Sequence, residues 1–79
     1  MVTLILYGTE ACHLCEQAKA LIYSVIDGTD IQLQEVDIAD DDALFSKYGI
    51  HIPVLKRTED ATECFWPFDT DQVRQLLNN

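Results

Sequence analysis

The pair Cys12 and Cys15 constrains this chain most, because the two thiols stand where a short apolar run gives way to an amphipathic pattern. Residues 4–7 are apolar and are followed by Gly8, which is typical of a buried strand. Two thiols three residues apart at the start of a helix share one face and can form a disulfide with little backbone movement. Cys12 would also meet unpaired backbone N–H groups and the positive end of the helix dipole, which favour a thiolate. The spacing therefore predicts a redox-active dithiol.

Size and hydropathy limit the architecture. The chain has 79 residues, of which 48% are hydrophobic, and this predicts one small globular domain over residues 1–79. No apolar run is long enough to span a membrane. The first residues lack a basic region and lead directly into the cysteine motif, so we expect them to belong to the fold and the protein to be cytoplasmic. In a reducing compartment, paired cysteines tend to be catalytic or metal-binding.

Acidic residues dominate the charge. Fourteen Asp and Glu against five Lys and Arg give a net charge of −9, which argues against nucleic acid or an anionic membrane as a partner. Basic or neutral proteins are compatible with this charge. The acidic run at 40–42 lacks the alternating spacing and glycine turn of a calcium loop, and a solvated helix start is the simpler interpretation.

The pattern along the chain predicts the order β-α-β-α-β-β-α. Strands are expected at residues 4–7, 31–38, 52–56 and 62–66, with an edge position for the second, which Glu35 interrupts. Helices are expected over the apolar positions 14–25, ended by Gly28, after the acids at 40–42, and before the C-terminus, where Asp69 or Thr70 provides the cap. Crossover helices make the first two strands parallel, and a tight turn at 59–61 makes the last two antiparallel. The predicted fold is an α/β, four-stranded mixed sheet with helices on both faces.

With this order in place, a family resemblance becomes visible. Cys12-His13-Leu14-Cys15 after the first strand, and Ile52-Pro53-Val54 at the third, resemble the thioredoxin superfamily and the glutaredoxins within it. The segment 64–69 is similar to small bacterial glutaredoxin-like proteins, and the resemblance covers essentially the whole chain. It implies a thioredoxin-like fold, Cys12 as nucleophile and Cys15 as resolving thiol. It also implies a cis Pro53 facing them, with the backbone of Ile52 pairing with the substrate.

The sequence departs from glutathione-binding glutaredoxins at the residues around the motif. Those relatives usually carry a basic residue shortly before the motif, where this chain has Thr9-Glu10, and His13 replaces their proline. They also carry a Gly-Gly step and an acidic residue after the fourth strand; here that segment is 66–69, and only Asp69 matches. Because of these departures, we expect glutathione to bind weakly. We expect His13 and Asp69 to contact the substrate.

The residues alone leave other interpretations open. Cys12 and Cys15 can simply pack at a helix end, or can bind zinc together with His13 or His51, although a second Cys-x-x-Cys is lacking. A shared iron–sulfur cluster would need thiols from elsewhere. A protonated His13 would favour the Cys12 thiolate, whereas nearby carboxylates would oppose it.

We predict a monomeric thiol–disulfide oxidoreductase without a bound cofactor, acting on a disulfide-containing protein or a small thiol. A non-enzymatic metal or iron–sulfur carrier, or a protein-binding module, is the alternative. The third cysteine, Cys64, is expected to be a small hydrophobic residue of the core.

Overall fold

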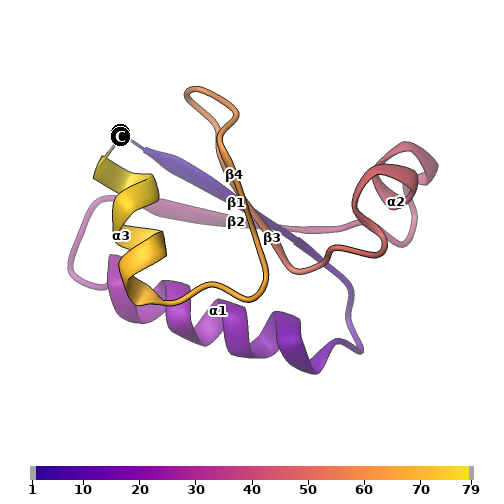
Figure 1. The fold of residues 1–79 in the computed structure, drawn as a ribbon, viewed down its shortest axis with the longest axis horizontal. Helices are drawn as coiled ribbons and strands as arrows, with labels where there is room; N and C mark the ends of the chain where they lie inside the picture. Colours follow the sequence, from indigo (N-terminus) through magenta and orange to yellow (C-terminus); the bar gives the residue numbers. More distant parts are fainter. Residues whose placement is uncertain (1, 79) are drawn as a thin grey trace.

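The computed structural model describes residues 2–78, and its elements follow the predicted order (Figure 1). The bounds are β1 (Thr3–Gly8), α1 (His13–Ile26), β2 (Gln32–Asp37), α2 (Asp42–Tyr48), β3 (Val54–Arg57), β4 (Glu63–Phe65) and α3 (Thr70–Asn78).

The sheet has the strand order β2-β1-β3-β4. β1 pairs in parallel with β2 and antiparallel with β3, and β3 and β4 form an antiparallel hairpin. The predicted mixed sheet and the edge position of β2 are therefore confirmed. Because Tyr7 pairs with Val54, the end of β1 that leads into the cysteine motif lies beside the start of β3.

Each helix begins at a residue whose side chain accepts a free backbone N–H, as the sequence predicts for the second and third helices. The Asp41 carboxylate accepts the Leu44 N–H at 3.0 Å at the start of α2. Asp69, and not Thr70, caps α3: its carboxylate accepts the Gln72 N–H at 2.9 Å, and the Gln72 side chain accepts the Asp69 N–H at 2.9 Å. At α1 the cap is Cys12.

Hydrophobic side chains fill both faces of the sheet. The larger cluster lies between the sheet and the pair α1 and α3, and its buried members are Leu4, Leu6, Ala18, Ile22, Ile26, Leu55, Phe68, Val73 and Leu76. The smaller cluster involves α2 on the opposite face, and its buried members are Tyr7, Ile38, Tyr48 and Val54. Helices therefore cover both faces, as predicted, but unequally. Within residues 2–78, no helix combines the length and apolar character needed to cross a bilayer.

All four strands differ from their predicted bounds by one or two residues, and the third differs most. The third strand begins at Val54 instead of residue 52, because Pro53 has no N–H for the ladder and the Ile52 N–H bonds to the Tyr48 carbonyl at 3.1 Å. The fourth strand is limited to Glu63–Phe65. The Ile52–Pro53 peptide bond is cis, as predicted, and the Trp66–Pro67 bond is also cis, which the sequence did not indicate.

A buried arginine joins the hairpin to the last helix. Arg57 is only 8% exposed, and its Nη1 donates to the Leu76 carbonyl at 2.8 Å in the final turns of α3. Its Nη2 pairs with Glu59 at 3.2 Å, while its Nε has no partner among residues 2–78. A cation near the C-terminal end of a helix also complements the negative end of the helix dipole.

We expect Arg57→Met to reduce the free energy of unfolding by about 1–3 kcal/mol, the cost of removing a charged donor from a buried carbonyl. Arg74→Met provides the matched control, because Arg74 forms only an exposed pair with Asp71 and should contribute within about 0.5 kcal/mol. Urea unfolding followed by circular dichroism measures both. Equal stability of Arg57→Met and wild type would mean that desolvation of the guanidinium cancels its bonds.

Candidate active site

Cys12 lies at the N-terminal end of α1, where its sulfur acts as the helix cap. The Cys15 N–H donates to the Cys12 Sγ at 3.1 Å, and the side chain of Cys12 is partly exposed. A sulfur that accepts a backbone N–H and faces the positive end of a helix is stabilised as a thiolate.

Cys15 occupies the first turn of α1 and faces the sheet. Its side chain is buried, with 7% of its surface exposed, so Cys12 is the more accessible thiol. The two Cα atoms are 5.2 Å apart, and the sulfur atoms form a disulfide. Gly8, at the end of β1, lies directly against the Cys15 sulfur.

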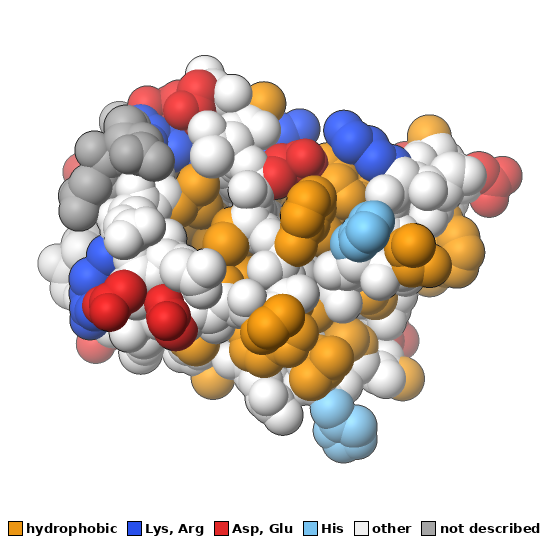
Figure 2. Space-filling model, viewed as in Figure 1, with side chains coloured by type: hydrophobic (Ala, Val, Ile, Leu, Met, Phe, Trp, Pro, Cys, Tyr) orange, Lys and Arg blue, Asp and Glu red, His pale blue; other side chains and the backbone are white. Residues whose placement is uncertain are grey.

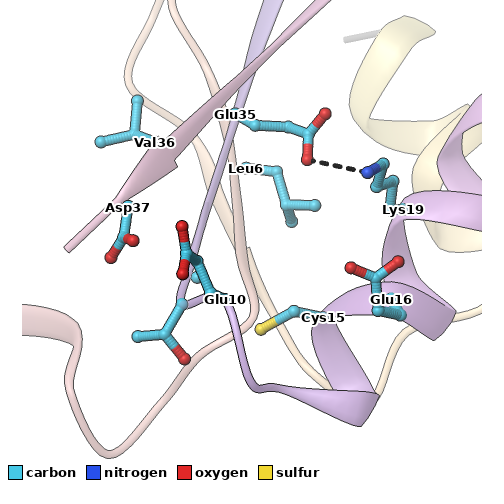
Figure 3. A pocket seen from close by; sticks show the side chains of 10 residues that line it. Leu6, Glu10, Cys15, Glu16, Lys19, Glu35, Val36 and Asp37 are labelled. Atoms are coloured by element: carbon cyan, nitrogen blue, oxygen red, sulfur yellow. Dashed lines mark ion pairs between the residues drawn. The ribbon is translucent and has the colours of Figure 1, made fainter. Parts of the chain in front are cut away.

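A pocket of about 310 Å³ opens beside Cys15, between α1 and the ends of β1 and β2 (Figure 3). The Cys15 sulfur points into it, and Leu6 and Val36 provide apolar wall. Its other side chains are mostly acidic; these are Glu10, Glu16, Glu35 and Asp37. The surroundings of the disulfide therefore carry a strong negative charge.

One lysine offsets part of this charge. Lys19 pairs with Glu35 at 3.3 Å across the pocket, and the hydrogen bond to this carboxylate raises the pKa of Lys19 (Figure 3). A smaller hollow of about 210 Å³ lies on the other side of the motif, against Cys12 and His13, and Glu10 and Glu16 line it as well. Glu10 and Glu16 thus line both hollows beside the disulfide.

Ile52 and Pro53 lie at the same end of the sheet as the motif. Pro53 precedes Val54, the partner of Tyr7, and therefore stands beside Gly8, which contacts Cys15. Its side chain is fully buried, and its carbonyl accepts the Trp66 N–H at 3.2 Å. Asp69, the other residue predicted to contact substrate, has a structural role: its carboxylate and its N–H both take part in the cap of α3.

The two histidines border an apolar area of the surface. On the face drawn in Figure 2, hydrophobic side chains gather between them. His13 is exposed at the first position of α1, and His51 stacks on the Phe65 ring with centroids 5.2 Å apart. Phe65 is 49% exposed. The area near the motif therefore offers apolar contact as well as charge.

Cys64 is separate from the disulfide in the sequence and lies on β4, next to the larger cluster. Partial burial and the Asp69 carboxylate raise the pKa of this thiol, which disfavours its thiolate form. It is only half-buried, so the predicted core position is approximate. Within residues 2–78, no three His, Cys, Asp or Glu side chains converge as a metal site would require.

Sequence reasoning missed two contributors to this site. Gly8 was visible only as the end of a strand, although its position four residues before Cys12 places it under the first turn of the helix. The pair Lys19 and Glu35 joins residues of α1 and β2, and a helical charge pattern alone does not reveal such a contact. Both contacts depend on the packing of α1 on the sheet.

Comparison with known proteins agrees with this fold. A structural-genomics target protein from X. campestris, solved by X-ray crystallography, is 37% identical over 95% of each chain, with a TM-score of 0.78. A protein from Nitrosomonas europaea is 28% identical, covering 94% of this chain and 88% of its own, with a TM-score of 0.81. A mutant thioredoxin from Halobacterium salinarum, at 23% identity and a TM-score of 0.75 over 98% of this chain and 72% of its own, shares the fold.

No curated protein matches the sequence. The family model described as "Glutaredoxin-like domain (DUF836)" matches residues 3–78, which is nearly the whole chain. The fold is thioredoxin-like, and the chain belongs to the glutaredoxin-like DUF836 family.

Proposed function

We propose that the protein is a thiol–disulfide oxidoreductase in which Cys12 attacks and Cys15 resolves. One observation carries the proposal: a partly exposed sulfur caps α1 and accepts a backbone N–H, while a buried sulfur three residues later is within reach of it. This asymmetry is what a dithiol needs if one sulfur is to meet the substrate and the other is to act only on the intermediate.

In the first step, the Cys12 thiolate of the reduced protein attacks one sulfur of a substrate disulfide. The substrate S–S bond breaks, one substrate sulfur leaves as a thiolate, and a mixed disulfide forms with Cys12. The N–H from Cys15 supports negative charge on Cys12 before the attack.

In the second step, the Cys15 thiol gives its proton to water or to the thiolate released in the first step, and its sulfur attacks the Cys12 Sγ. The mixed disulfide breaks, the second substrate sulfur leaves as a thiolate, and the protein is left with the Cys12–Cys15 disulfide. The substrate has gained two electrons. A thiol or dithiol reductant must then return two electrons to the protein.

The surroundings of the motif favour a disulfide-containing protein as the substrate. The apolar area between the histidines suits a polypeptide surface, with His13 beside the reacting sulfur. Since the Ile52 N–H is bonded to Tyr48, we propose that the Ile52 carbonyl next to Pro53 pairs with the substrate backbone. A contact between Asp69 and the substrate remains a prediction. The cap of α3 already uses the Asp69 carboxylate.

We expect Cys12→Ser to abolish reduction of a disulfide-linked peptide, because the attacking sulfur is gone. Cys15→Ser should still attack, and should accumulate the mixed disulfide with the peptide. Mass spectrometry under non-reducing conditions detects this adduct. Cys64→Ser is the control and should turn over normally, since its thiol lies outside the site.

Full turnover by Cys15→Ser would instead indicate a route with a single thiol. Stoichiometric zinc or iron in the purified protein, with no reversible loss of two thiols, would favour the alternative carrier function.

The acidic surroundings of the motif make glutathione a poor reductant in this proposal. Glutathione carries a net negative charge, and the like-charged Glu10 and Glu16 line both hollows beside the disulfide. Pro67 has no N–H to donate to the tripeptide. A backbone contact to the tripeptide would need an open segment, whereas the side chain of the next residue, Phe68, is buried in the core.

We expect Glu10→Lys to speed reduction of the oxidised protein by glutathione about two- to fivefold at low salt, and less at high salt, as for a screened surface charge. Quenched thiol trapping measures the rate. Asp30→Lys makes the same charge change just before β2, whose start pairs with the opposite end of β1, and should have little effect. Rapid, saturable reduction of the unmodified protein at micromolar glutathione would contradict weak binding.

A further inference from the structure

The residue beneath the disulfide is a glycine whose backbone does not require one. Gly8 is the last residue of β1, pairs with Asp37 in the sheet, and accepts the Ile38 N–H at 3.0 Å. Its φ lies outside the left-handed region, unlike that of Gly28, where φ is +80°. Any L-residue can adopt such a strand conformation. The reason for glycine must therefore be space.

The space is taken by the resolving cysteine. A methyl group placed on Gly8 would lie 2.8 Å from the Cys15 Sγ and 3.3 Å from its Cβ. Separations below 3.0 Å are essentially never tolerated by a real Cβ, so one of the two groups would have to move. The side chains of Leu6 and Leu4, two and four residues earlier on the same face of β1, are large and buried. On this face of β1, the position without a side chain, Gly8, is the one that lies against the Cys15 sulfur.

The two redox states differ in their freedom to avoid such a clash. In the disulfide, the Cys15 sulfur is bonded both to its own Cβ and to the Cys12 sulfur, and disulfide geometry is specific. In the dithiol, the same sulfur can rotate about the Cα–Cβ bond. The pocket of about 310 Å³ beside Cys15 gives it room to do so.

From these contacts we infer that Gly8 is a positioning residue: the absence of a side chain at this position stabilises the disulfide form selectively, by leaving the Cys15 sulfur where Cys12 can bond to it. Gly8 acts only through Cys15 and touches no substrate. The inference rests on the proposed redox function of the two cysteines and adds to it a determinant of their redox equilibrium.

The test equilibrates oxidised protein with reduced and oxidised dithiothreitol. The reagent dithiol gives two electrons and two protons to the protein disulfide and becomes the cyclic disulfide, and acid-quenched thiol trapping counts the protein thiols. Gly8→Ala should shift this equilibrium toward the dithiol at least about tenfold, which is about 30 mV for a two-electron couple. This shift does not depend on catalysis of any substrate reaction.

Gly28→Ala is the matched control. Apart from the chain neighbours of Gly28, no atom of residues 2–78 lies within 4 Å of the added methyl group, but the positive φ of this residue makes alanine unfavourable. This variant should be destabilised equally in both redox states, so its dithiothreitol equilibrium should match that of the unmodified protein. A general loss of stability therefore cannot imitate the effect expected for Gly8.

A second pair of variants covers the case in which Gly8→Ala folds poorly. Cys15→Ala removes the sulfur at 2.8 Å and keeps the Cβ at 3.3 Å. Gly8→Ala should therefore cost much less stability in the Cys15→Ala background than in the oxidised protein, as urea unfolding will measure.

An unchanged dithiothreitol equilibrium in Gly8→Ala, or an equal loss of stability in both backgrounds, would overturn the inference. If the equilibrium shifts but no peptide disulfide is ever reduced, the positioning role holds and the proposed function fails.

Discussion

The packing of alternate β1 side chains on α1 is the interaction on which the site depends. Leu4 and Leu6 are buried in the larger cluster together with Ala18 and Ile22 of α1. Burial contributes about 2 kcal/mol for each leucine, whereas an exposed pair such as that of Lys19 with Glu35 contributes less than about 1 kcal/mol. The leucines therefore determine how the helix lies along the strand. The next position on the same face, Gly8, consequently meets the first turn of the helix.

Two electrostatic influences oppose each other at the accessible sulfur. The backbone N–H of Cys15 and the end of the helix stabilise negative charge on Cys12, while Glu10 and Glu16 oppose it. A charge-assisted hydrogen bond contributes about 1.5–3 kcal/mol, and an exposed like charge under about 1 kcal/mol. In the proposed function, activation of the thiol is thus a local property of the helix terminus. The carboxylates would act mainly on which molecules approach.

Much of the architecture could be predicted because it depends on local patterns. Alternation, helical spacing and capping residues such as Asp41 gave the element order, the edge strand and the helix starts. The cysteine pair indicated which end of the sheet carries the candidate site. The strand start at Val54 was missed, because the pattern of apolar residues continues through Pro53 although its ladder hydrogen bond is impossible. Burial of Arg57 and the contact of Gly8 with Cys15 depend on how distant elements pack, which no local pattern encodes.

The edge strand β2 has a consequence for solubility. One side of this six-residue strand pairs with β1, and its other side faces outward with a free row of N–H and C=O groups. Such a row is a template onto which another chain can add. Glu35 and Asp37 place negative charge along it, in a protein whose net charge is −9. The charge along this edge therefore repels a second copy of the same strand, so the surface charge that keeps molecules apart also protects the fold's open edge against edge-to-edge aggregation.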